Sequence, residues 1–294
     1  MTPPTRLVLP APAKLNLFLH VTGRRADGYH ELESVFVPIT LADTVTLTLR
    51  KDGQIRLIDP PSGLTEENDL ACRAARAFQL AAGTTLGVDI HLKKAIPQGG
   101  GLGGGSSDAA TTLLGLNRLW SLSQTRDQLR AVGAKLGADV PFFIFGQPAF
   151  ASGVGERLLA MSIPSDDYVV AFPGVGVATA SVFADLSLTR NTSSTAKSVF
   201  VKSYGHNDLQ PIAERLQPRI SALRSVFIQA GAEPRMTGSG ACVFAPSRDA
   251  TSARALAAHL RSANWQCWAV KSIARHPLFS FASDRIASVN GAII

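Results

Sequence analysis

The sequence has few cysteines and no long apolar run. Only three of its 294 residues are cysteine, Cys72, Cys242 and Cys267, and they are far apart and without the spacing of metal ligands. This pattern excludes a disulfide framework and favours a reducing cytoplasm. No apolar segment reaches the roughly 18 to 20 residues of a membrane helix, and the run Leu7–Leu9 stops at Pro10, too short for a secretion signal. We therefore expect a cytoplasmic protein that does not bind a membrane.

The sequence is also short of acidic residues. It has 29 lysines and arginines against 22 aspartates and glutamates, a net charge of +7 and an isoelectric point near 9.7. A positive surface attracts anions of any kind. The basic residues are scattered, with pairs such as Arg24-Arg25 and Lys93-Lys94, and no RNA- or DNA-binding motif accompanies them. We therefore expect a small-molecule anion rather than nucleic acid as the partner. As a separate expectation, the protein is a monomer or weak homodimer.

The chain is long enough for two domains. With 294 residues and 46% hydrophobic composition it can form two modest cores. A soft boundary near residues 155–165 predicts an N-terminal domain over 1–160 and a C-terminal domain over 161–294. The one mildly biased stretch, SLTRNTSSTAKS (187–198), is predicted to be an exposed loop.

Alternating apolar residues predict strands near the N-terminus. In AKLNLFLHV (13–21) three leucines alternate with Lys14, Asn16, Phe18 and His20, which indicates a half-buried strand with Lys14 and Asn16 on its polar face. An Asp27-Gly28 turn leads to a second strand, ELESVFVPITL (31–41). Further strands are predicted at 44–49, 54–58 and 88–96, and helices from Asn68 or Asp69 to Gly83, over about 125–136 and over 250–262. The first helix would bury Leu70, Ala74, Ala77, Phe78 and Ala81.

A glycine cluster separates a predicted strand from a predicted helix. PQGGGLGGGSSDAA (97–110) has six glycines in seven positions. The apolar residues after it share one helical face: Ala109, Leu113, Leu116 and Trp120. Without Cβ atoms, consecutive N–H groups can converge on an anion, and the helix start adds unpaired N–H groups. Ser106 and Ser107 can cap the helix or reach a phosphate oxygen. Each glycine costs conformational entropy on folding, and a simple turn does not require so many glycines. We therefore predict a phosphate-binding loop.

Two common phosphate-binding patterns do not fit this loop. A Walker loop needs Gly-Lys-Ser/Thr, and the chain contains no Gly-Lys pair. A dinucleotide fingerprint matches through Gly99, Gly101 and Gly104, but it requires an acidic residue at the end of the next strand about 20 residues on. Asp127 instead lies in a polar, helical stretch, so this pattern is weak.

Three segments together resemble the GHMP small-molecule kinases. The glycine cluster (97–110) resembles their second motif, and TGSGACVFA (237–245) resembles their third. PAKLNLFLHVTGRRADGYHELESVF (12–36) resembles the N-terminal motif of the 4-diphosphocytidyl-2-C-methyl-D-erythritol kinases within that family. The resemblance implies a two-domain α+β fold with the active site between the domains. It also implies ATP-dependent phosphorylation of the 2-hydroxyl of that diphosphocytidyl alcohol, a step in non-mevalonate isoprenoid synthesis.

The chemistry of phosphoryl transfer requires alignment of a hydroxyl and neutralisation of charge. Asp139 follows a predicted helix end and precedes an apolar segment, where it would be poorly solvated unless paired. The resemblance implies that Asp139 is the catalytic base and that Lys14 is its partner, stabilising charge and orienting the hydroxyl. From the residues alone, a turn aspartate and a solvated lysine remain alternatives.

The resemblance also implies a set of ATP ligands. Lys94 matches a basic position near the adenine, although Lys93 is adjacent and could take that place. The residues expected to hold ATP are Lys94, Pro97, Gly99, Gly101, Leu102, Gly103, Gly104, Gly105, Ser106 and Ser107. Mg²⁺ is expected with ATP. No acidic cluster marks a metal site, so phosphate oxygens and water would hold the ion.

Aromatic residues indicate where a nucleobase binds. The turn before Tyr29 and His30 would present a ring that stacks on a base and an imidazole that bonds its edge. The resemblance implies cytosine as that base, with Phe183 closing it from the other side and Thr179 near the diphosphate; ordinary packing is the alternative. The other residues expected at the substrate are Asn16, Phe36, Gly238 and Gly240. A GHMP kinase for homoserine or mevalonate is the alternative function, but such an alcohol has no base for Tyr29 and His30.

Overall fold

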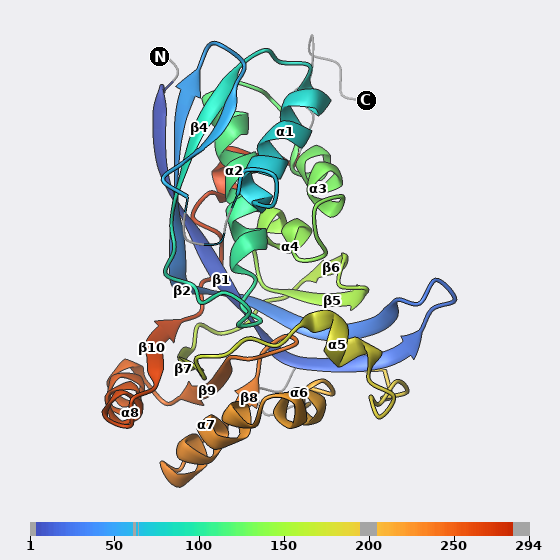
Figure 1. The fold of residues 1–294 in the computed structure, drawn as a ribbon, viewed down its shortest axis with the longest axis vertical. Helices are drawn as coiled ribbons and strands as arrows, with labels where there is room; N and C mark the ends of the chain where they lie inside the picture. The colour runs from blue at the N-terminus through green and yellow to red at the C-terminus, as the bar shows by residue number, and fades with distance from the viewer. Residues whose placement is uncertain (1–3, 61–62, 64, 195–204, 285–294) are drawn as a thin grey trace.

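A long β-hairpin at the N-terminus organises the fold (Figure 1). The computed structural model describes residues 4–60, 63, 65–194 and 205–284. Strands β1 (Arg6–Arg24) and β2 (His30–Arg50) pair antiparallel along their length. The predicted hairpin is confirmed, and the two segments 31–41 and 44–49 belong to one continuous strand. The turn of the hairpin projects as an arm beside a short helix, α5 (Thr179–Ala184).

The first sheet has six strands and is built around β2. Its order is β3-β4-β2-β5-β6, and β1 pairs with β2. β2 has three partners because its residues 44–50 pair with β4 and its residues 32–36 pair with β5, while β1 follows both parts. The other strands are β3 (Ile55–Ile58), β4 (Gly87–Lys93), β5 (Ala149–Gly153) and β6 (Arg157–Ala160).

Four helices pack together on one side of this sheet (Figure 1). They are α1 (Leu70–Ala82), α2 (Gly104–Leu119), α3 (Arg126–Ala134) and α4 (Val140–Phe145). The predicted helix over 125–136 corresponds to α3, which begins with a capping box between Thr125 and Gln128. The glycine cluster therefore connects β4 to α2, in the predicted order of strand, loop and helix.

Helix α1 has the predicted caps. The side chain of Asp69 accepts a hydrogen bond from the N–H of Cys72 at 3.0 Å, and Gly83 ends the helix with a φ of 62°. Its buried residues are Ala71, Cys72, Ala74, Ala75 and Phe78. The prediction was wrong at Ala81, which is exposed, because the buried stripe is shifted around the helix from the predicted one.

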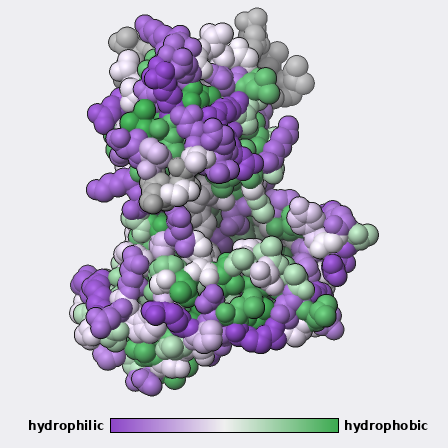
Figure 2. All heavy atoms as spheres, in the orientation of Figure 1, coloured by the Kyte–Doolittle hydropathy of each residue, from purple (hydrophilic) through white to green (hydrophobic). Residues whose placement is uncertain are grey.

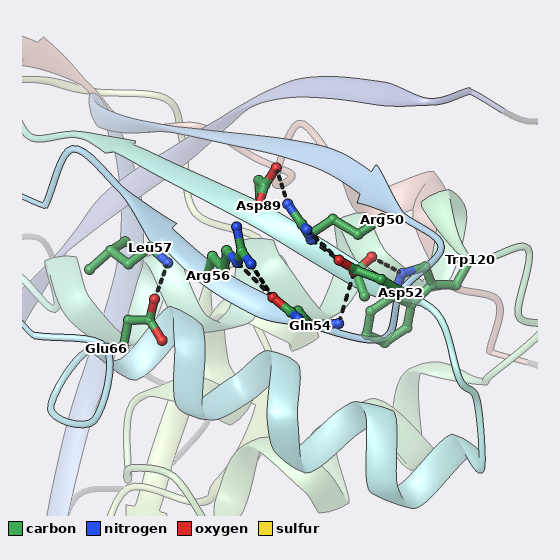
Figure 3. Close-up of polar contacts among 9 residues, drawn as sticks. Arg50, Asp52, Gln54, Arg56, Leu57, Glu66, Asp89 and Trp120 are labelled. Atoms are coloured by element: carbon green, nitrogen blue, oxygen red, sulfur yellow. Dashed lines mark hydrogen bonds and ion pairs between the residues drawn. The ribbon is translucent and has the colours of Figure 1, made fainter.

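Polar contacts hold the strand ends together at the far end of the first sheet (Figure 3). Arg50 on β2 reaches Asp89 on β4 at 2.9 Å and also pairs with Asp52 in the following turn. The N–H of Leu57 on β3 donates to Glu66 at 3.0 Å. Because β4 runs from this end to the glycine loop, these contacts anchor the strand that leads into the loop.

The second sheet has four strands in the order β10-β7-β9-β8. Its strands are β7 (Asp167–Phe172), β8 (Arg235–Met236), β9 (Val243–Ser247) and β10 (Gln266–Lys271), and the helices of this part are α6 (Gln210–Leu216), α7 (Pro218–Gln229) and α8 (Ala250–Ser262). The 3₁₀ helix η1 (Phe279–Phe281) follows β10 and packs with the helices of the first sheet. The predicted helix over 250–262 is confirmed. Figure 2 shows that the molecule narrows between the parts built on the two sheets. Leu19 and Val21 of β1 pack in the core of the second sheet, so the hairpin contributes to both parts. The division near residue 160 stays a proposal.

Burial excludes the alternative of a solvated lysine. Lys14 and Asn16 are 3% and 2% exposed, because α4, the glycine loop and the loop at Thr237 cover the face of β1 that carries them. The exposed loop predicted over 187–198 is confirmed for its described residues 187–194, most of which are exposed, although Leu188 is buried; its residues 195–198 lie outside the described ones. Among the described helices, none combines the length and apolar character needed to cross a membrane.

Candidate active site

A buried lysine and a carboxylate face each other where β1 meets α4. Lys14 Nζ lies 3.7 Å from Asp139 Oδ2, and Asp139 is the N-cap residue of α4. The ammonium also donates to Asn16 Oδ1 and lies 5.0 Å from the centre of the Phe36 ring. Burial lowers the pKa of Lys14, and the charge of Asp139 opposes this decrease. The pair can therefore place a cation and a hydrogen-bond acceptor beside one hydroxyl group.

Asn16 is fixed by groups from both parts of the molecule. Its amide Nδ2 donates to Ser34 Oγ on β2 at 2.8 Å, and its backbone N–H donates to Thr237 Oγ1 at 2.9 Å. Ser34 in turn donates to the carbonyl of Phe18. These contacts orient the amide oxygen toward Lys14. Ser34 and Thr237 were missed from the sequence, although each belongs to a quoted motif.

The glycine loop packs against a second glycine-containing loop, residues 237–241. The N–H groups of Ala241 and Cys242 donate to the carbonyls of Gly99 and Gly100 at 3.1 and 3.0 Å. A Cβ at Gly101, where φ is 73°, would lie 2.3 Å from a backbone oxygen of the second loop. Part of the glycine requirement therefore comes from this contact between backbones. Gly238 and Gly240 belong to the second loop, so their small size serves this contact as well as the expected close approach to a ligand.

The start of α2 leaves backbone donors unpaired. Gly103 is the N-cap residue and makes no side-chain cap, so the expected serine caps are wrong. Ser107 is fully buried and donates to the carbonyl of Pro12 at 2.7 Å, which takes its hydroxyl away from the loop. The first N–H groups of a helix have no intrahelical acceptor. Gly104, Gly105 and Ser106 supply these groups, and all three line an open cavity.

Lys94 forms ion pairs with two carboxylates. Its ammonium contacts Asp43 on β2 and Asp108 on α2, and both acids are buried. Asp43 also accepts hydrogen bonds from the N–H groups of Ala95 and Ile96. It therefore fixes the backbone that enters the glycine loop. Neither acid was predicted, because no sequence pattern joins residues 43, 94 and 108.

This cluster predicts a dependence of stability on pH. Burial raises the pKa of Asp108 to about 7, with Asp43 adding to the rise and Lys94 opposing it. Folded Asp108 then keeps a proton that the unfolded chain releases near pH 3.8. Stability is therefore lost as pH rises through this window, by up to roughly 1 kcal/mol per pH unit. The pKa of Lys94 is raised above 10.5, so its titration lies outside the window.

We expect Asp108→Asn to remove this slope. Urea unfolding between about pH 5 and about pH 8 should show the variant gaining stability relative to the wild type as the pH rises. Asp127→Asn, at a carboxylate whose side chain is 83% exposed, is the control and should keep the wild-type slope. Equal slopes for Asp108→Asn and the wild type would contradict the expectation.

A third group of residues lies at the arm of the hairpin. His30 packs on Phe183 of α5, with ring centroids 5.1 Å apart and an interplanar angle of 30°. Arg190 donates to His30 Nε2 at 3.0 Å. Tyr29 is 64% exposed. Arg190 was missed because the sequence indicated only an exposed loop.

Three cavities adjoin along the site. A cavity of about 460 Å³ is lined by Lys94, Pro97 and the glycine loop up to Ser106. A central cavity of about 320 Å³ is lined by Lys14, Asn16, Phe36, Asp139, Phe183, Gly238 and Gly240. A third, of about 590 Å³, is lined by Tyr29, His30 and Phe183. Thr179 lines all three, and its hydroxyl lies 2.7 Å from Ser239 Oγ. The cavities therefore form one cleft with Lys14 and Asp139 in its middle part.

Some expected site residues do not reach this cleft by their side chains. Leu102 is buried and contributes its carbonyl, which accepts from the N–H of Lys14 at 3.0 Å. Gly103 allows close packing, since a Cβ there would lie 3.0 Å from the Phe143 ring. Ser107, as described above, bonds to the backbone of β1. Ser107 supports the site from behind, whereas Leu102 and Gly103 also border the cavity beside the glycine loop.

Comparisons with known proteins identify the fold and the family of this chain. The family described as GHMP kinases N terminal domain matches residues 69–147, and the GHMP kinases C terminal family matches residues 197–266. Among solved structures, the chain is similar to a 4-(cytidine 5'-diphospho)-2C-methyl-D-erythritol kinase, with a TM-score of 0.80 and 37% identity over 90% of this chain and 99% of that one. A homoserine kinase from Cytophaga hutchinsonii, at 16% identity and a TM-score of 0.64 over 94% and 97% of the two chains, shares the fold.

Relatives of known name match over almost the whole chain. The 4-diphosphocytidyl-2-C-methyl-D-erythritol kinase of Herminiimonas arsenicoxydans is 50% identical over 93% of this chain and 97% of that protein. The protein of the same name from Ralstonia pickettii is 49% identical over 93% and 96%. The predicted two-domain α+β kinase fold is confirmed. The chain therefore belongs to the GHMP kinases, in their 4-diphosphocytidyl-2-C-methyl-D-erythritol kinase family.

Proposed function

We propose that the protein transfers the γ-phosphoryl group of ATP to the 2-hydroxyl of 4-diphosphocytidyl-2-C-methyl-D-erythritol. The observation that carries the proposal is the continuous cleft, which has an anion-binding helix start at one end and an aromatic cavity at the other. The Lys14–Asp139 pair lies in the part that joins them. The cleft therefore offers chemically suitable surfaces for the base, the diphosphate and the alcohol of an extended substrate.

ATP fits the cavity beside the glycine loop. The N–H groups of Gly104, Gly105 and Ser106 and the positive end of a 16-residue helix favour phosphate oxygens. Lys94 lines the same cavity, where a base or a phosphate would be within its reach. Among the described residues, no group of three His, Cys, Asp or Glu is placed to hold a metal. Mg²⁺ would therefore be held by phosphate oxygens and water, and would neutralise charge on the transferred group.

Asp139 and Lys14 would act on the acceptor hydroxyl. The carboxylate accepts the hydroxyl proton or holds the hydroxyl in line with the phosphoryl group. The ammonium of Lys14, fixed by Asn16, offsets negative charge as it spreads over the phosphoryl oxygens. Burial of Lys14 strengthens this effect because little water screens it.

Tyr29, His30 and Phe183 would hold the cytosine, and Thr179 with Gly238 and Gly240 would face the diphosphate. All of these residues line the cleft within a single chain. We propose a monomer or weak homodimer. The three cysteines are buried and free, as suits a reducing cytoplasm.

The proposal is tested by phosphorus NMR of the purified protein with Mg-ATP. With the diphosphocytidyl substrate we expect a new phosphomonoester signal and an intact diphosphate, and with homoserine or mevalonate no product. ADP formation with one of the simple alcohols, and none with the diphosphocytidyl compound, would overturn the proposed substrate.

A further inference from the structure

Arg190 holds together the wall of the cavity that would take the base. Its guanidinium donates to His30 Nε2 at 3.0 Å and to four carbonyls at the end of α5 and in the segment that follows it. These acceptors are the oxygens of Phe183 at 3.3 Å, Asp185 at 2.7 Å, Leu186 at 3.5 Å and Leu188 at 3.1 Å. One side chain therefore fixes both the position of Phe183 and one ring nitrogen of His30.

The contact with Arg190 determines which nitrogen of His30 carries the proton. A guanidinium can only donate, so Nε2 of the imidazole must be the acceptor. An imidazole that accepts at Nε2 is neutral. Burial, with the charges of Arg190 and Arg24, lowers the pKa of His30 and favours this form. The single ring proton then lies on Nδ1. Within the part of the chain that the structure describes, nothing accepts a hydrogen bond from Nδ1.

A fixed Nδ1–H group distinguishes between pyrimidines. Cytosine has an acceptor at N3, whereas uracil has an N–H donor there, and both have an acceptor at O2. A donor on the cavity wall therefore suits the N3 edge of cytosine and opposes that of uracil. With both tautomers available, the imidazole could satisfy either base. The position of the ring proton of His30, on Nδ1 rather than Nε2, would therefore determine which base is preferred.

We propose that Arg190 is a positioning residue for base specificity, which holds His30 as an Nδ1–H donor and so favours a cytosine over a uracil ring. This inference rests on the proposed function for its substrate. It does not depend on catalysis, because base recognition can be measured by binding alone. A residue that only stiffened the loop would affect both bases equally.

The test uses the full chain and two probes, CDP and UDP. Titration calorimetry should give tighter binding of CDP than of UDP by about ten- to a hundredfold in the wild type. Arg190→Gln should lower this ratio to within about threefold of unity. Nitrogen-15 NMR should show His30 protonated on Nδ1 in the wild type, with its signal shifted by CDP, and a mixture of tautomers in the variant.

A matched control separates specificity from loop stability. Arg215 ties the same segment through Asp185 and Ser187 without contacting His30. Arg215→Gln should weaken CDP and UDP binding equally and keep the ratio. An unprotonated Nδ1 in the wild type, or an unchanged ratio in Arg190→Gln, would overturn the proposal. If CDP is selected and shifts His30 but no substrate is phosphorylated, the proposed function fails and the inference stands.

Discussion

Asp139→Asn is expected to lower kcat by about 10²- to 10⁴-fold, with a much smaller change in KM. The substitution keeps the shape of the side chain but removes the acceptor for the hydroxyl proton. It also leaves Lys14 without the carboxylate 3.7 Å from its ammonium. Since that carboxylate opposes the decrease in the pKa of Lys14, the pKa should fall further. The alkaline limb of the kcat/KM profile should therefore move to lower pH.

Steady-state assays across the pH range test this expectation, with Asp127→Asn on the exposed face of α3 as the control. The control should match the wild type in both rate and pH profile. A value of kcat for Asp139→Asn within about threefold of the wild type would contradict a role in proton transfer, since general-base catalysis contributes much more than that.

Gly101→Ala is expected to damage both stability and activity. The added Cβ would lie 2.3 Å from the carbonyl oxygen of Thr237 and 2.9 Å from that of Gly240, at a φ of 73°. Backbone atoms cannot move away as a flexible side chain can, so the two glycine loops must separate. Overpacking costs about 1–3 kcal/mol or more, in addition to about 1–2 kcal/mol for the left-handed conformation. Displacement of the loop by about 1 Å would lower kcat by about 10²-fold.

A control glycine separates the two contributions. Gly231 has a φ of 76°, and a Cβ there would meet nothing within 4 Å. Gly231→Ala should therefore lose only about 1–2 kcal/mol and keep its activity. Urea unfolding and kcat are measured for both variants. Equal losses of stability would show that contact between the loops contributes nothing beyond backbone strain.

The sequence predicted correctly those elements that depend on interactions between residues close in sequence. The caps of α1 follow from Asp69 and Gly83, and the strand, loop and helix order around the glycine cluster follows from composition. The motifs also indicated the site residues, of which all but Ser107 line the cleft. The caps and the order around the glycine cluster depend on residues that are close in sequence, whereas the site residues were indicated by the family resemblance.

The remaining features depend on contacts between distant segments. Asp43 and Asp108 meet Lys94 only because β2 and α2 both adjoin the entrance to the glycine loop. Arg190 reaches His30 over 160 positions of sequence. The alternating pattern around Lys14 indicated its polar face but not its burial, because a single strand carries no information about the helix and the loops that will cover it.

Because both parts of the molecule share the hairpin, their unfolding is coupled. The strand that carries Lys14 also places Leu19 and Val21 in the core of the second sheet, and Leu19 exchanges backbone hydrogen bonds with His206 and Asp208. Unfolding of either part would therefore expose apolar surface of the same strand and weaken the other. The two parts should behave as one cooperative unit, in which Lys14 keeps its position only while both remain folded.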